Sequence, residues 1–296
     1  MTAPAGRVAA VILNHKDNAN ALRLVRTLRG CAEVGPICVV DNSETGGLTG
    51  REEPLKESGV LFLQTANDGY SKGNNLGISA VESQCGLPEI FLIANPDILI
   101  DADAVARCVR LLRTHPELAL AAPRMLRGDG TPHDLPGWRR RTVRGDLAYS
   151  SGILARTLGM RREAYPPSYW NERSFVRVDC AAGACFFIRA NAFKACGYFD
   201  ERSFLFYEED ILGEKLRRIG LGEAVCTDCT YRHLEGVSAA VSLRKYRIMQ
   251  RSRFYYHKVY RRAGSAALFA LRAATALGTC ECLLKQALHT LKLRNR

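Results

Sequence analysis

Short apolar runs alternate with helical repeats along the first third of the chain. The apolar runs, which have the length of buried strands, lie at residues 8–13, 37–40, 60–63 and 90–94. Between them, apolar residues recur at helical spacing in residues 20–28, 71–81 and 101–114. Continuous apolar runs are typical of strands that are covered on both faces. The order β-α-β-β-α-β-α therefore predicts an α/β fold with a mainly parallel, Rossmann-like sheet flanked by helices.

Each predicted strand ends in a polar cluster. These clusters contain Asn14, Asp41, Asn67, Asn95 and Asp97. Ligands of parallel sheets bind beyond the carboxyl ends of the strands, so we expect these residues to meet at one edge and form a site. A single cluster is better explained as a turn that ends its strand, whereas four clusters at one edge favour a site.

Two of these clusters suit a ligand that carries a sugar or a phosphate. Asp41 can accept hydrogen bonds from a ribose hydroxyl or a base imino group, or it can cap a turn. Residues 67–77, which include Gly69, Gly73 and Asn74, form a strand-to-helix turn rich in Gly and Asn. The N-terminus of the following helix offers free N–H groups to a phosphate or a sugar, although a plain helix start explains the same pattern. The spacing matches neither the dinucleotide fingerprint nor the P-loop, which disfavours both.

Four acidic residues and one histidine further along can hold a cation or move a proton. Asp97 follows the most hydrophobic strand, and Mg²⁺ or Mn²⁺ needs only one or two protein carboxylates when the substrate supplies other ligands. An Asx-Pro turn is the alternative there. Residues 208–210, Glu-Glu-Asp, begin a helix, where acids stabilise the helix dipole or where one of them acts as a general base. His233 can complete a metal site or contact a diphosphate, or it can be structural.

The chain has 11 cysteines, an odd and dilute number that excludes a small disulfide scaffold. Cys226 and Cys229 have the spacing of two zinc ligands, with His233 nearby. A closed zinc site needs a fourth ligand, which Cys180 or Cys185 supplies only if folding brings it close. We therefore expect no zinc site.

Basic residues cluster in two parts of the chain. A segment flanked by prolines contains Arg139, Arg140, Arg141, Arg144, Arg161 and Arg162. It is interpreted either as a mobile segment near a substrate or as a solvated surface loop.

The second basic part is the C-terminal tail, which accounts for the whole net charge of +12. Residues 244–296 contain 13 Lys and Arg and a single acid, Glu281, so the preceding residues are neutral overall. A cationic amphipathic helix lies in a membrane interface, so we expect attachment to an anionic membrane surface. A helix packed on the body is the alternative. We expect no membrane span and no signal peptide, which predicts a cytoplasmic protein, peripheral on the inner face of the cytoplasmic membrane.

Over about residues 7–260, the motifs and their order resemble the family 2 nucleotide-sugar glycosyltransferases of GT-A fold, in particular their bacterial rhamnosyltransferase-like branch. The most specific match is Asn-x-Gly-Tyr-x-x-Gly-Asn-Asn-x-Gly, which begins at Asn67. Residues 39–43, Val-Val-Asp-Asn-Ser, resemble the aspartate motif of the second strand. Asn95-Pro96-Asp97 stands where the family has Asp-x-Asp, and residues 199–210 resemble its segment ending in Glu-Asp.

The resemblance implies an inverting hexosyltransferase. It would move a sugar, with rhamnose from dTDP-rhamnose favoured, to a saccharide or polyprenyl-linked acceptor in cell-surface polysaccharide synthesis. By this resemblance, the nucleotide-sugar donor is bound by Asn14, Asp41, Asn67, Gly69, Gly73, Asn74 and Asn95. Asp97 and His233 would bind Mg²⁺ or Mn²⁺, weakly because Asn95 replaces the first acid. Glu209 would be the catalytic base, with Asp210 competing for that role.

The expected domains are a GT-A catalytic domain and a basic helical extension. The catalytic domain spans residues 1–240, with a nucleotide-sugar-binding half at 1–100 and an acceptor and catalytic half at 101–240, and the extension spans 241–296. A non-catalytic or nucleotidyltransferase-type protein that binds nucleotide sugars is the alternative function. We expect no nucleic-acid partner, because such a partner leaves the acidic residues at the strand ends unexplained.

Overall fold

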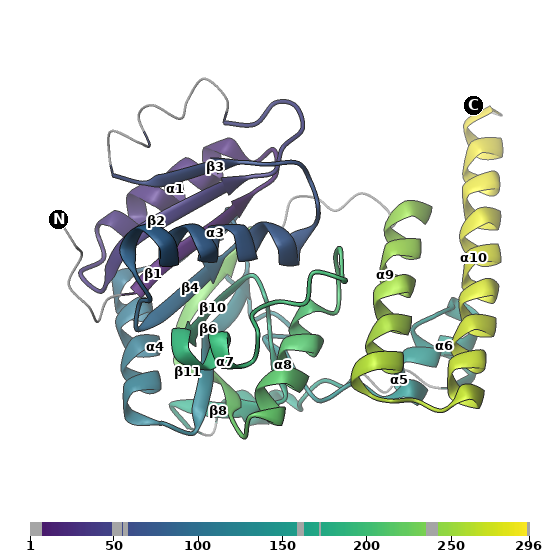
Figure 1. Ribbon diagram of the computed structural model, residues 1–296. Helices are drawn as coiled ribbons and strands as arrows, with labels where there is room; N and C mark the ends of the chain where they lie inside the picture. The colour runs from purple at the N-terminus through teal and green to yellow at the C-terminus, as the bar shows by residue number, and fades with distance from the viewer. Residues whose placement is uncertain are drawn as a thin grey trace.

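A mixed sheet forms the centre of the molecule (Figure 1). The computed structural model describes residues 8–48, 55, 59–158, 163–171, 173–234 and 242–294, with the side chains of the last helix as far as residue 285. Among these residues the sheet has nine strands, of which eight follow the order β3-β2-β1-β4-β10-β6-β11-β5, and β8 pairs with β11. The strands are β1 Val8–Asn14, β2 Val34–Asp41, β3 Leu61–Gln64, β4 Ile90–Ala94, β5 Ile98–Leu99, β6 Leu118–Arg127, β8 Phe175–Val178, β10 Cys185–Arg189 and β11 Gly222–His233.

The first half of the sheet is parallel, as the sequence predicts. β1 pairs in parallel with both β2 and β4, and β2 pairs in parallel with β3. β10 runs antiparallel between β4 and β6, and β11 returns parallel to β6. The prediction of a mainly parallel α/β sheet is confirmed.

Helices cover both faces of this sheet and explain the continuous apolar runs. On one face, Val8, Ala10 and Ile12 of β1 pack in a core shared with α1 (Asn18–Arg29) and α4 (Ala102–Thr114). On the other face, the alternate residues of β1 pack with α3 (Tyr70–Cys85), α7 (Ala190–Ala195) and α8 (Glu208–Arg218). Because successive side chains of a strand point to opposite faces, every position of β1 is buried, and all of them except the last, Asn14, are apolar.

The C-terminal helices stand at one edge of the molecule (Figure 1). They are α9 Leu243–Tyr255, a π-helical turn η2 Tyr256–Tyr260, and α10 Ser265–Arg294. α10 packs along α9 and contacts α5 (Val143–Ala148) and α6 (Gly152–Leu158) near its base. Glu281, the single acid of the tail, accepts hydrogen bonds from Ser151 Oγ at 2.7 Å and from the Gly152 N–H at 2.7 Å. This acid therefore attaches α10 to the start of α6.

The apolar character of α10 differs from what the sequence analysis expected of the tail. By length and composition, the Ser265–Lys285 part of α10 could cross a membrane, with a mean hydropathy of 1.4 and 17% of its window buried. The sequence analysis expected no such segment. The proposed domain boundary at residue 240, and Arg161 and Arg162 of the first basic segment, lie outside the described residues.

Candidate active site

Two neighbouring cavities form one cleft at the carboxyl ends of β1 and β4. The rim cavity has a volume of about 520 Å³ and is lined by residues that include Asn42, Asn67, Gly69 and Asp97. The inner cavity has a volume of about 640 Å³ and is lined by residues that include Trp138, Glu209, Asp210 and His233. Tyr70, Asn95 and Leu205 line both cavities, so the two are continuous.

Asp97 and His233 meet at the wall of this cleft. β5 pairs antiparallel with β11, which places His233 opposite Ile98, next to Asp97. His233 Nε2 lies 3.3 Å from Asp97 Oδ1, and both side chains are partly exposed. Burial alone would raise the pKa of Asp97, but the hydrogen bond and the charge of His233 outweigh it and lower the pKa. An ionised carboxylate beside an imidazole is a suitable pair of ligands for a divalent cation.

Asp210 is a buried carboxylate whose two oxygens both accept hydrogen bonds. Trp138 Nε1, from β7 (Gly137–Trp138), donates to Asp210 Oδ1 at 2.9 Å. Arg141 Nε donates to Asp210 Oδ2 at 2.9 Å, and the exposed fraction of the Asp210 residue is only 1%. Asp210 thus holds Trp138 and Arg141 in place at the inner cavity.

Glu209 is the more accessible of these two acids. It lies in the first turn of α8, which begins at Glu208. The two residues before this helix, Phe206 and Tyr207, have φ angles of +71° and +69°. Such angles strain residues other than glycine, and strained backbone is concentrated at functional sites. The carboxylate packs so closely on Gly183 that a Cβ there would collide with Glu209 Oε1. Burial raises the pKa of Glu209 to about 7, the charge of Asp210 adds to this increase, and Arg141 opposes it.

Asp41 and Asn14 lie beneath the wall of the rim cavity, with no exposed surface. Asp41 Oδ1 accepts hydrogen bonds from Asn14 Nδ2 at 3.1 Å and from Ser43 Oγ at 2.6 Å, and Asp41 Oδ2 accepts one from the Leu48 N–H at 2.5 Å. The carboxylate therefore organises the loop after β2, and the neighbouring Asn42 lines the cavity instead. Direct contact between Asp41 and a nucleotide stays a prediction, and it requires one of these hydrogen bonds to be replaced.

The Gly- and Asn-rich turn contains positions that line the rim cavity and positions that serve packing. Asn67 and Gly69 line the rim cavity, and Gly69 has a φ of +101° where its backbone passes Phe204. Gly73 packs α3 onto the sheet, because a Cβ there would lie 2.6 Å from Leu13 Cδ1. Asn74 is buried and its Nδ2 donates to the Tyr70 carbonyl at 3.0 Å. The structure thus explains Gly73 and Asn74 by packing, and their role in donor binding stays a prediction.

Curated relatives of the chain are named as a hexosyltransferase and a rhamnosyltransferase, and no protein-family model matches the chain. The low-salt glycan biosynthesis hexosyltransferase Agl10 of Haloferax volcanii is 27% identical over 228 residues, which cover 76% of this chain and 66% of the relative. The N-acetylglucosaminyl-diphospho-decaprenol L-rhamnosyltransferase of Mycobacterium tuberculosis is 26% identical over 195 residues, covering 62% of this chain and 61% of the relative. The chain spans less than two thirds of the length of either relative.

Solved structures share the fold. The crystal structure of GalNAc-T7 with UDP, GalNAc and Mn²⁺ matches 86% of this chain and 50% of that chain, with a TM-score of 0.60 and 15% identity. The structure of Staphylococcus aureus TarS matches 91% of this chain and 43% of that chain, with a TM-score of 0.52 and 14% identity. The chain has the GT-A glycosyltransferase fold. The predicted GT-A fold is confirmed, and the named relatives support the prediction of a glycosyltransferase.

This GT-A protein also uses charged residues that the sequence analysis did not single out as site residues. Asp146, in α5, is fully buried, and its Oδ2 accepts a hydrogen bond from Tyr207 Oη at 2.8 Å and lies 2.7 Å from His257 Nε2. Arg253 of α9 donates to Tyr207 Oη at 2.8 Å, and Arg141 lies 3.5 Å from Asp146 Oδ1. Arg141 and Arg253 line the inner cavity. The sequence marked both only as members of basic segments. Asp210, a partner of Arg141, and Asp146, the partner of Arg253, come from distant parts of the chain.

Proposed function

We propose that the protein transfers a hexosyl group, with inversion, from a nucleoside-diphosphate sugar to a hydroxyl of a saccharide or lipid-linked acceptor in glycan synthesis. One observation carries this proposal: Glu209 and His233, the partner of Asp97, line the same inner cavity. A general base and a candidate cation site in one cleft are the two groups that glycosyl transfer to a hydroxyl requires. The relatives named as hexosyltransferase and rhamnosyltransferase support the hexosyl group, and they favour rhamnose.

Glu209 is the proposed general base. It takes the proton of the acceptor hydroxyl while that oxygen attacks the anomeric carbon, and the bond from this carbon to the nucleoside diphosphate breaks. A single displacement of this kind inverts the configuration. The pKa of about 7 keeps a large fraction of Glu209 ionised at neutral pH and makes it a stronger base than an exposed glutamate.

Asp97 and His233 fit a divalent cation. The carboxylate oxygen and the imidazole nitrogen are adjacent, partly exposed and open to the cleft, and oxygen and nitrogen ligands suit Mn²⁺ or Mg²⁺. A neighbour of the same fold was solved with UDP and Mn²⁺. When bound, the cation would neutralise charge that develops on the departing diphosphate. Asn95 offers an amide rather than a carboxylate at the same edge, so we propose that the affinity is weak.

The inner cavity offers an aromatic wall to an acceptor sugar. Trp138 lines the cavity and is held by its hydrogen bond to Asp210, so its ring is fixed before a ligand arrives. Tyr149 and Tyr207 line the same cavity. Large rigid aromatic side chains bury much apolar area at little conformational cost, which suits the apolar face of a sugar ring.

A transfer assay tests the function. A panel of nucleotide sugars, dTDP-rhamnose included, is offered with lipid-linked and saccharide acceptors, with and without Mn²⁺. We expect transfer from one donor and a decrease of about 10²-fold or more in kcat/KM for Asp97→Asn, because the carboxylate ligand is lost. Asp103→Asn, at an exposed position on α4, is the matched control and should retain full activity. Donor binding without transfer or hydrolysis for the whole panel contradicts catalysis and favours a nucleotide-sugar-binding protein.

The proposed base also predicts the pH dependence of the reaction. Below pH 7, Glu209 is increasingly protonated and cannot accept the proton, because its pKa is about 7. We expect kcat/KM to fall about tenfold per pH unit on the acidic side and to level off above the pKa. Initial rates across this range, with circular dichroism as the control for folding, measure the profile. A flat profile speaks against Glu209 as the base.

The C-terminal extension is the proposed membrane contact. Arg202, Arg244, Arg247 and Arg251 line a third cavity of about 780 Å³, which we name the arginine groove. Phe204, Arg244 and Ile248 line both this groove and the rim cavity. On α10, exposed apolar side chains include Phe269, Leu283 and Leu284. Guanidinium groups suit phosphates, and exposed apolar side chains suit a lipid interface.

Co-sedimentation with vesicles checks this contact. We expect the full chain to bind vesicles that contain anionic lipid more strongly than neutral vesicles, and Phe269→Asp to weaken binding by about tenfold or more. Leu76→Asp, at an exposed apolar residue of α3, is the matched control and should bind like the wild type. Equal binding of all three proteins to both kinds of vesicle contradicts the proposal.

A further inference from the structure

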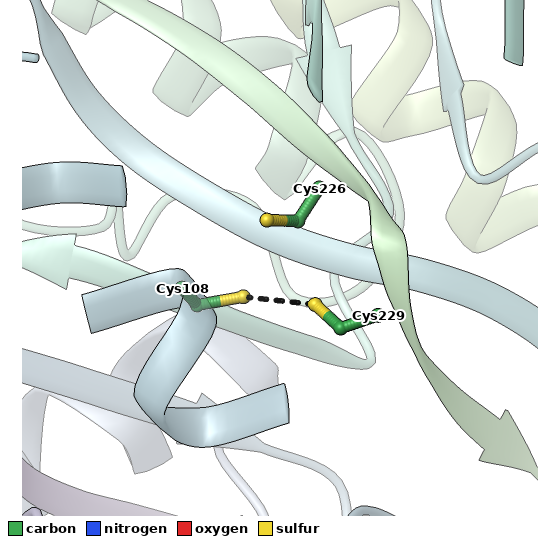
Figure 2. A group of neighbouring side chains, drawn as sticks. All are labelled: Cys108, Cys226 and Cys229. Atoms are coloured by element: carbon green, nitrogen blue, oxygen red, sulfur yellow. Dashed lines mark hydrogen bonds between the residues drawn. The ribbon is translucent and has the colours of Figure 1, made fainter. Parts of the chain in front are cut away.

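Three buried cysteines meet between α4 and β11 (Figure 2). Cys108 comes from α4, and Cys226 and Cys229 come from β11. All three sulfur atoms lie within 4.8 Å of one another, and the Cys108 and Cys229 sulfurs are 4.0 Å apart. Residues three apart on a regular strand point to opposite faces, but the register of β11 shifts between Cys226 and Thr230. This bulge brings both β11 cysteines to the face that packs on α4.

The spacing of the cluster is close to that of a tetrahedral zinc site. Zinc–sulfur bonds of about 2.3 Å place two thiolates about 3.8 Å apart, and a thiolate and a carboxylate oxygen about 3.5 Å apart. Asp228 does not belong to the group whose ligand atoms all lie within 4.8 Å of one another, but its Oδ1 lies 3.5 Å from Cys226 Sγ, which makes this carboxylate the candidate for the fourth ligand. Arg107 Nη1 donates to the other oxygen, Asp228 Oδ2, at 3.0 Å. This arginine orients the carboxylate and offsets part of the negative charge of the ligands.

We propose that Cys108, Cys226 and Cys229 bind one zinc ion, with Asp228 at the fourth position, and that this ion fixes α4 to β11. A small surface cavity of about 160 Å³ is lined by Cys226, Asp228 and Arg107 and provides the entry path. Binding releases the thiol protons to solvent. Four protein ligands leave no open position, so the site is structural and independent of the proposed transfer reaction. The sequence analysis expected no zinc, because it did not consider Cys108 as a ligand.

Metal analysis of the full chain tests the proposal. The protein is purified with a thiol reductant, its zinc is counted by mass spectrometry, and the metal-free form is titrated with Co²⁺. We expect one zinc per chain and the charge-transfer absorption of cobalt bound to thiolates. Cys226→Ser and Cys229→Ser should lose both signals, and Cys85→Ser, outside the cluster, should keep them. Asp228→Asn should keep the cobalt–thiolate absorption but bind about 10–100-fold more weakly.

A second measurement is independent of the folding of the variants. Zn²⁺ added to the reduced, metal-free wild type should raise the melting temperature, because a ligand of the folded state stabilises it. In Asp97→Asn, which removes the carboxylate of the proposed cleft site, Mn²⁺ should not reproduce this increase, whereas zinc should raise the melting temperature as it does in the wild type. This comparison separates the cysteine site from the cleft. The proposal is wrong if the wild type neither retains zinc nor takes up Co²⁺, or if two of the three cysteines are found in a disulfide in reduced preparations. It is also wrong if Cys85→Ser loses the metal as Cys226→Ser does.

Discussion

Glu209→Gln is expected to lower kcat by about 10²–10⁴-fold while donor affinity stays unchanged. Glutamine has the same shape as glutamate, but its amide cannot take the proton of the acceptor hydroxyl. Glu209 lines the inner cavity, whereas Asn67 and Gly69, two of the residues proposed to bind the donor, line the rim cavity. Single-turnover rates and calorimetric titration with the donor nucleotide measure the two quantities separately.

Glu208→Gln is the matched control for this prediction. Burial raises the pKa of Glu208 well above its usual range, and the charge of Glu209 adds to the increase, which favours the protonated form of Glu208. Glutamine resembles this protonated acid, and we expect a small effect on kcat. If Glu209→Gln retains turnover and Asp210→Asn abolishes it, the base has been assigned to the wrong residue.

Asp146→Asn is expected to lower the free energy of unfolding by about 3–5 kcal/mol. The substitution removes the negative charge that Arg141, Arg253 and His257 face in the core. Buried cations that lose their partner keep the desolvation cost without the compensating attraction. Urea denaturation measures this loss, and Asp134→Asn, in an exposed pair with Arg127, should cost at most about 1 kcal/mol.

The same substitution should change the pH dependence of stability. Burial alone would raise the pKa of Asp146, but the hydrogen bond from His257 and the charges of Arg253 and Arg141 outweigh it and lower the pKa. A lowered carboxyl pKa stabilises the fold above the unfolded-state pKa, and this contribution is lost as the pH falls toward the folded-state value. The free energy of unfolding of Asp146→Asn should lack this pH-dependent contribution. Equal stability of Asp146→Asn and Asp134→Asn contradicts the assigned role of Asp146.

The Asp146 cluster changes the interpretation of the C-terminal extension. The sequence analysis interpreted the positive charge of residues 244–296 as a membrane-contacting surface, with a helix packed on the body as the alternative. Arg253 and His257 are instead buried against the body, with exposed fractions of 3% and 0%. Removing the extension should therefore expose the core, and the membrane contact is better tested by single substitutions on α10.

The succession of strands and helices along the first third of the chain, and the polar ends of the strands, could be predicted because they depend on neighbouring residues. The apolar run from Val8 to Leu13 indicates a doubly covered strand, since alternate side chains serve two different cores. Asn67 follows β3, and Asn95 and Asp97 follow β4; all three lie at the cleft because these strands run parallel to β1 and β2 and end at the same edge. The role of Cys108 could not be predicted from spacing, because only the packing of α4 on β11 places it beside Cys226 and Cys229.

By itself, the sequence determined the α/β order, the polar edge of the sheet and the chemical types of residue gathered there, because periodicity and turn preference act between near neighbours. Tertiary structure alone decided which of these side chains face the cleft. In the folded protein, Asp41 accepts a hydrogen bond from its own loop, and the two oxygens of Asp210 accept hydrogen bonds from Trp138 and Arg141. Glu209 lines the cavity, and its pKa is raised to about 7. Burial and charge pairing depend on groups brought from distant parts of the chain, so they exist only in the folded protein.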